Sequence, residues 1–149
     1  MREGWPLLVL AAACVRRAEP PKAAPGPPEL SWKSMSRAQR TTYMEKVVVP
    51  EMQPMFAALD PKRFATFNCR TCHGPTFDDG TFDMPNPDLL RLPSTAAGMI
   101  PLVKTKGPWL EAMTKRIKPT MARLLGLQEF DPDHPQPDAF GCHGCHLMD

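Results

Sequence analysis

Four of the five cysteines occur in two copies of one short motif, each followed at once by a histidine. The copies are Cys69-Arg70-Thr71-Cys72-His73 and Cys142-His143-Gly144-Cys145-His146. C-x-x-C-H is the attachment signature of c-type haem, in which each thiol adds across a vinyl group and the histidine ligates the iron. Because only 4 of the 149 residues are histidine, two such placements by chance have odds of roughly one in a thousand. The sequence therefore predicts two covalent haems, with His73 and His146 as proximal ligands.

Two segments upstream of the motifs share one pattern. The matching positions, at one constant offset, are Met44, Lys46, Pro50 and Met52 in the first and Met113, Lys115, Pro119 and Met121 in the second. Each segment is followed by Phe-x-Cys-x-x-Cys-His, with four extra residues before the second copy. We interpret this as a duplicated unit of helix, loop and haem motif. Chance similarity between two helices rich in Lys and Met is the alternative.

The sixth ligand of each iron has to come from outside the motifs, and the chain has 10 methionines. A thioether suits a haem that passes electrons at raised potential. Met52 and Met121 are the first candidates because they occupy corresponding positions in the repeat. The alternatives are Met55, one turn from Met52, and Met84 in a proline-braced stretch, as well as the further pair Met44 and Met113. A haem with a weak or absent sixth ligand is a further alternative.

The pattern of helix starts and stops predicts an all-α fold, made of a few short helices with long Pro-rich loops wrapped around two haems. Ser36-Arg37-Ala38-Gln39 is a capping-box pattern that opens a helix toward Val49. We expect Pro50 to kink this helix before a segment from Glu51 to Leu59. Asp60-Pro61 predicts another helix start.

In the second half, Gly107-Pro108 predicts the start of a helix that is kinked at Pro119 and ends near Gly126. Residues 74–95 contain several prolines and little periodicity, so they predict a loop with one turn after Asn86-Pro87. No run alternates clearly enough to predict a strand.

The first residues have the features of an export signal: Arg2, an apolar run from Trp5 to Ala13, and small residues at its end. The run is shorter than the roughly 20 apolar residues that span a bilayer. Cys14 follows it directly, an arrangement that resembles a bacterial lipobox, in which the cysteine is lipidated. Ala11 stands where lipoboxes usually carry leucine, so ordinary cleavage or a wrongly assigned start are the alternatives.

These features divide the chain into a signal peptide over 1–13, a lipidated Cys14 with a Pro-rich tether over 14–32, and a dihaem domain over 33–149. Within that domain the half-units cover about 35–80 and 107–149. One cysteine for lipid and four for haem leave none for a disulfide. We therefore expect an exported protein, anchored by lipid on the periplasmic side of a bacterial membrane.

Composition and charge narrow the classes of partner. The net charge of +2 does not suggest a nucleic-acid binder. Basic residues gather between Lys104 and Arg123, opposed only by Glu111, whereas the C-terminal stretch is acidic. A solvated helix face explains such a cluster. The functional interpretation is a docking surface for an acidic redox partner.

The order of methionine-bearing helix, short connection and C-x-x-C-H, over residues 35–73 and 109–146, resembles the tetrahaem cytochrome subunit of photosynthetic reaction centres. That subunit is a lipoprotein that donates electrons, so the resemblance implies electron transfer. The chain departs from it in having two motifs and a proline between Met44 and Met52. It is also similar to small exported dihaem cytochromes of delta-proteobacterial type, which carry similar Phe-x-Cys-x-Thr-Cys-His-Gly and Met-Pro-Asn-Pro stretches.

Three functions are compatible with these observations. The first is an electron carrier, in which the protein supplies ligands, an apolar pocket and a docking surface. The second is a dihaem enzyme or ligand sensor, such as a peroxidase, which needs an open iron and an acid–base residue; His134 is the spare imidazole in an ordinary setting. The third is a zinc-binding module built from the two CxxC pairs, which leaves the two matched histidines unexplained.

Overall fold

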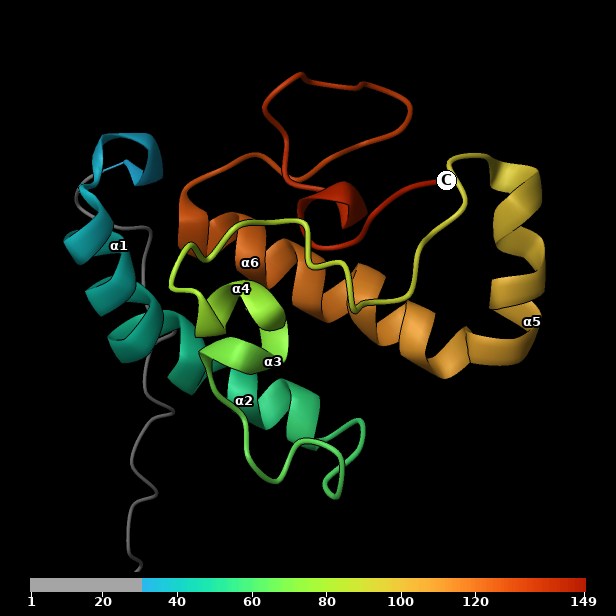
Figure 1. Cartoon of the computed structure of the whole chain (residues 1–149). Coiled ribbons are helices and arrows are strands. Elements are labelled where there is room, and N and C mark those ends of the chain that lie inside the picture. The colour runs from blue at the N-terminus through green and yellow to red at the C-terminus, as the bar shows by residue number, and fades with distance from the viewer. Residues whose placement is uncertain (1–30) are drawn as a thin grey trace, which may run out of the picture.

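The structure is a computed structural model that describes residues 31–149. The expected signal peptide, Cys14 and nearly all of the tether lie outside the described residues. The described part is helical, and its only β-type pairings are isolated bridges (Figure 1). This agrees with the predicted all-α class. None of the helices between residues 31 and 149 has the length and apolar character needed to cross a membrane.

The first half begins with a 3-10 turn, η1 (Trp32–Ser34), and continues as α1 (Arg37–Tyr43), the π-helical segment η2 (Met44–Val48) and α2 (Val49–Ala57). The capping box predicted at Ser36 is confirmed, with reciprocal hydrogen bonds to Gln39. The helix continues through Pro50 because the helical turn just before this proline is a π turn, which is wider than an α-helical turn. The N–H of Val49 donates to the carbonyl of Met44, five residues back, and this bulge accommodates a proline that has no N–H to donate.

The second half repeats this arrangement in α5 (Ala96–Ala112), the π-helical η3 (Met113–Ile117) and α6 (Lys118–Leu125). The N–H of Lys118 donates to the carbonyl of Met113, again five residues back and directly before a proline. Lys106 has non-helical angles (φ −127°, ψ 20°). It therefore divides α5 just before the predicted start at Gly107. The helix ends at Gly126, as predicted, and the structure shows this glycine in a left-handed conformation.

Downstream of α2 the structure differs from the sequence prediction in two places. Pro75–Asp78 forms a short helix, α4, in a stretch predicted to be loop. The Asp60 carboxylate accepts the N–H groups of Lys62 and Arg63 as a cap would, but no helix follows. The chain instead turns so that Phe64 and Phe67 become buried. Burial of two phenylalanines, about 1.5–3 kcal/mol each, outweighs the local helix signal.

The core lies between the two π-helical segments and this turn. Its buried members are Val48, Met52, Phe64, Phe67, Ile117 and Leu124. The phenylalanines pack edge to face, with ring centroids 6.3 Å apart, and Trp109 of α5 contacts Phe64 at 5.9 Å. The hydroxyl of Tyr43 donates to the carbonyl of Leu124 at 2.7 Å, which ties α1 to α6. The two halves thus share one core.

The C-terminal segment returns to the middle of the chain through two parallel bridges, Asn86 with His146 and Leu92 with Met148. Figure 1 shows this segment, with the short turn η4 (Cys142–Gly144), above α3 (Cys69–His73) and α4 and in front of α6. The bridges hold the second C-x-x-C-H motif against the loop between α4 and α5.

Candidate functional site

A cavity of about 680 Å³ opens between the two halves, within the range of about 300–1,000 Å³ that is usual for ligand sites. Among its wall residues are three side chains from each half, spaced four residues apart. They are Val48, Met52 and Phe56 from the first half and Ile117, Met121 and Leu125 from the second. These six residues are related by the same offset as the sequence repeat. The cavity is therefore lined by equivalent positions of the two segments.

The first motif forms one wall of this cavity. Asn68 caps α3 by accepting the N–H of Arg70, and the Thr71 hydroxyl oxygen accepts the backbone N–H of Asn68 in return. On the short helix Cys69 and Cys72 are three residues apart, so both thiols share one face. Both thiols and His73 line the cavity. The arrangement presents two sulfurs and one imidazole to the same apolar space, as the attachment of one macrocycle requires.

The imidazole of His73 is held by packing. Its Nδ1 is buried without a hydrogen-bond partner among the described side chains and backbone groups. The ring stands edge-on to Phe82 at 5.4 Å between centroids. Burial lowers the pKa of His73, with a smaller opposing effect from the backbone of Phe82. The folded chain thus favours the neutral imidazole, which is the form that binds a metal.

The second motif turns through η4, and its cysteine Cys145 lies in the wall of the same cavity. Nδ1 of His146 lies 2.7 Å from the carbonyl oxygen of Leu90. An imidazole that donates its Nδ1 proton to a carbonyl keeps Nε2 free, the usual arrangement of a metal-ligating histidine. His143, inside the motif, instead packs edge-on against Phe130 at 5.7 Å.

The two motifs lie next to each other. Burial, with a smaller contribution from the neighbouring Cys145, raises the pKa of Cys72 to about 12. Burial likewise raises the pKa of Cys145 to about 11. Both thiols are therefore protonated at neutral pH, and the second cysteine of each motif sits in the apolar region between the halves.

The structure brings several candidate methionines to this cavity. Met52, which is 2% exposed, and Met121 both line it, as do Met44 and Met84. Met55 packs against the core but does not line the cavity, and the same holds for Met113. Met52 and Met121 thus face one shared space that also contains the first motif, whereas the sequence analysis assigned one methionine to each haem.

Asn86, which the sequence analysis did not select, is a buried polar residue at this site, 2% exposed. Its Nδ2 donates to the carbonyl of Cys72 at 2.9 Å, and its backbone N–H donates to the carbonyl of Cys145 at 3.0 Å. Its Oδ1 accepts the N–H of Asp88. The only sequence signal was its place in the Met-Pro-Asn-Pro stretch, which does not reveal long-range partners.

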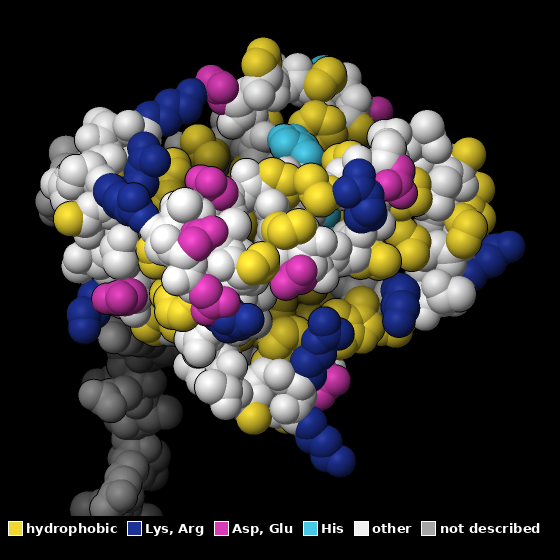
Figure 2. Space-filling model, in the orientation of Figure 1, with side chains coloured by type: hydrophobic (Ala, Val, Ile, Leu, Met, Phe, Trp, Pro, Cys, Tyr) yellow, Lys and Arg dark blue, Asp and Glu magenta, His cyan; other side chains and the backbone are white. Residues whose placement is uncertain are grey.

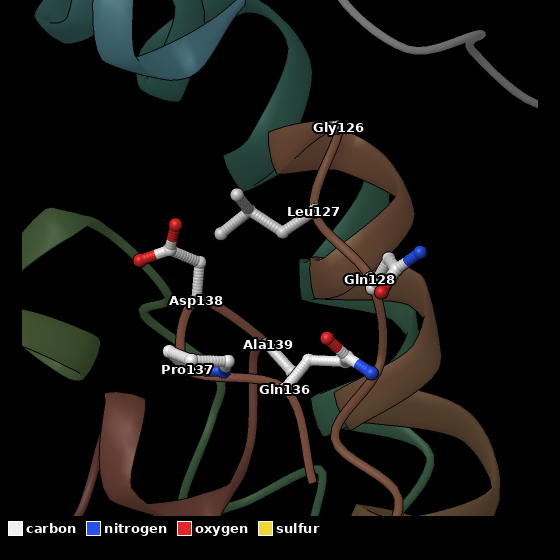
Figure 3. A pocket seen from close by; sticks show the side chains of 7 residues that line it. All are labelled: Gly126, Leu127, Gln128, Gln136, Pro137, Asp138 and Ala139. Atoms are coloured by element: carbon white, nitrogen blue, oxygen red, sulfur yellow. The ribbon is translucent and has the colours of Figure 1, made fainter. Parts of the chain in front are cut away.

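Other predicted groups lie away from the cavity. His134 is exposed and pairs with Asp131 in the C-terminal loop. In residues 31–149 no three His, Cys, Asp or Glu side chains are grouped so that they could hold a metal ion. A shallower pocket of about 300 Å³, between Gly126 and the Gln136–Ala139 loop, contains no motif residue (Figure 3).

The basic stretch from Lys104 to Arg123 is partly neutralised. Lys115 pairs with Glu111, Lys118 with Glu129 and Arg123 with Glu51. Lys104, Lys106 and Arg116 are exposed. On the face shown in Figure 2, Lys and Arg side chains are scattered among hydrophobic and acidic ones and form no single dense patch.

Comparisons of the chain with protein families, with curated proteins and with solved structures gave no match.

Proposed function

We propose that this protein is a dihaem c-type cytochrome, tethered by lipid at Cys14 on the periplasmic side of a bacterial membrane, where it carries electrons. The observation that carries the proposal is the position of the first motif: Cys69, Cys72 and His73 face an apolar cavity of about 680 Å³ together with Met52 and Met121. Thiols, a neutral imidazole and thioethers around one apolar space form the donor set of a haem.

The first haem would be attached through Cys69 and Cys72, with His73 as proximal ligand. Each of the two thiols would add across one vinyl group of the haem, exchanging its S–H bond for an S–C bond, with the hydrogen going to the neighbouring vinyl carbon. The buried Val48, Phe67 and Ile117 exclude water from the cavity wall. Met52 is our first choice for the distal position because it is buried there, with Met121 and Met84 as alternatives.

The second haem would be attached through Cys142 and Cys145, with His146 as proximal ligand. The carbonyl of Leu90 fixes the tautomer and direction of that imidazole. Leu90, whose carbonyl contacts this histidine, and Met148, two residues after it in the chain, keep 55% and 37% of their surface exposed. Such exposed apolar side chains next to a ligand suit a flat apolar cofactor that would cover them.

Bound haem would supply an iron that cycles between the ferrous and ferric states by one electron. The chain itself would hold the imidazoles, exclude water and present a surface to partners. Docking of a redox partner at the Lys104–Arg123 stretch remains part of the proposal, carried by the exposed Lys104, Lys106 and Arg116. The proposal also includes a relationship to small exported dihaem cytochromes and the origin of the two halves by duplication of one unit.

The decisive experiment is a haem count on the full chain, made with a cytochrome c maturation system. The pyridine haemochrome spectrum, divided by protein concentration, should give two covalent haems per chain. The double variants C69A/C72A and C142A/C145A should each keep one haem, and a variant at Cys14 should keep both. A chain without haem after denaturation and extraction would refute the proposal, and metal analysis for zinc would then be the next measurement.

A further inference from the structure

Asn86 forms hydrogen bonds to both C-x-x-C-H motifs and so links them. It lies in the loop between α4 and α5, far from both motifs in sequence, yet it is almost fully buried. One hydrogen bond from its side chain reaches Cys72, and one from its backbone reaches Cys145. Since each bond is about 2.9 Å long, these two carbonyl oxygens lie at most about 10 Å apart.

Asn86 has little freedom to move. Its Oδ1 accepts the N–H of Asp88. The side-chain Nδ2, the side-chain Oδ1 and the backbone N–H of Asn86 therefore all have hydrogen-bond partners. Gly74, which ends α3, leaves just enough room for it: a Cβ there would lie 2.4 Å from Asn86 Oδ1. A buried asparagine with each group satisfied fixes its surroundings in one arrangement.

We propose that Asn86 is a positioning residue that sets the spacing and orientation of the two haems, so that they form a close pair that exchanges electrons directly. This inference rests on the proposed function, because it presupposes a haem on each motif. The second cysteine of each motif is the one held by Asn86, so the haem edges attached there would face the same region. Electron exchange falls steeply with edge separation, and a fixed spacing keeps it fast.

The spacing can be measured by circular dichroism in the Soret region of the holoprotein. Two haems close together give a two-signed Soret signal, because their transition dipoles couple with a strength that falls as the cube of the distance. Asn86→Asp keeps the acceptor for Asp88 but replaces the donor to Cys72 with a carboxylate oxygen. Asn86→Ser removes that donor without adding charge.

Thr76→Val is the matched control. The Thr76 hydroxyl donates to the carbonyl of His73 at 2.8 Å, so this variant also loses a hydrogen bond to the first motif but touches nothing in the second. We expect the two-signed signal in the wild type and in T76V. Its amplitude should fall at least about twofold in N86D and N86S, because positioning looser than about 0.5 Å spreads the haem orientations.

Each outcome has one meaning. Two haems per chain with an unchanged signal in both Asn86 variants would overturn the inference and leave the proposed function intact. So would two haems in the wild type without the two-signed signal. Haem loss from both Asn86 variants, but not from T76V, would also overturn it, since Asn86 would then serve attachment and not spacing. Absence of haem from the wild type would refute the proposed function itself.

Discussion

Gly74→Ala should be among the most destabilising single substitutions in the described part of the chain. Gly74 directly follows His73 and has φ 62° and ψ −136°, a region that side chains with a Cβ rarely adopt. An added Cβ would lie 2.4 Å from Oδ1 of Asn86 and 2.8 Å from its Cγ and Nδ2. Asn86 cannot swing away freely, because its side chain is bonded to Cys72 and Asp88.

The magnitude comes from these two contributions. Backbone strain of this kind costs about 1–3 kcal/mol. Displacing Asn86 leaves a buried amide and a carbonyl without partners, which costs about 1–3 kcal/mol more. Alanine also reduces the freedom of the unfolded chain, which returns about 0.4–1 kcal/mol. We therefore expect the free energy of unfolding to fall by about 1–5 kcal/mol, a substantial share of the roughly 5–15 kcal/mol of a typical domain.

The assay is equilibrium unfolding of the holoprotein in guanidinium chloride, followed by far-ultraviolet circular dichroism. Gly107→Ala is the matched control, because a Cβ at that helical position meets no atom within 4 Å. That variant should be neutral or up to about 1 kcal/mol more stable than the wild type. A loss below about 1 kcal/mol for G74A would show that Asn86 yields easily, and would undermine the inference that it fixes the two motifs.

Two further predictions concern the core. Met52→Ala should lower the free energy of unfolding by about 2–5 kcal/mol and abolish the near-infrared band of a methionine-ligated ferric haem. Met55 lies outside the cavity wall, so Met55→Ala should keep that band. A band retained in M52A would exclude Met52 as the ligand. Tyr43→Phe should cost about 0.5–1.5 kcal/mol through the lost bond to Leu124. Burial raises the pKa of Tyr43, opposed in part by Arg123, so the folded state holds the phenol proton longer than the unfolded state. Stability should thus decline above about pH 10 in the wild type, and less so in Y43F, in unfolding curves compared with those at about pH 8.

The features that the sequence predicted well are local. The capping box at Ser36 and the helix end at Gly126 depend on residues within one turn, and both are present. The sequence predicts kinks at Pro50 and Pro119, but the helix continues through both positions. A π turn before each proline accommodates the residue that has no N–H to donate. A proline in a sequence signals the lost hydrogen bond but not the way in which the chain compensates for it.

The features that the sequence did not predict depend on distant partners. The cap at Asp60 forms without a helix, because Phe64 and Phe67 gain more from burial in the core. The bond from His146 to Leu90 spans 56 positions, and the bond from Asn86 to Cys72 spans 14. Neither leaves a periodic trace in the sequence. Asparagine is a common turn residue, and only its burial distinguishes Asn86 from an asparagine in an ordinary surface turn.

The two π turns explain how one cavity comes to be lined by both halves. Each turn inserts an extra residue ahead of a proline and so rotates the rest of its helix about the helix axis. The residue that closes the first turn, Val48, and its counterpart Ile117 are both buried against the cavity, and Met52 and Met121 lie one turn later. Without the bulge, these side chains would be rotated around the helix, and the two apolar stripes would no longer face each other. The matched prolines at Pro50 and Pro119 are therefore part of what shapes the cavity, and a substitution that removes one bulge should misalign only that half of the wall.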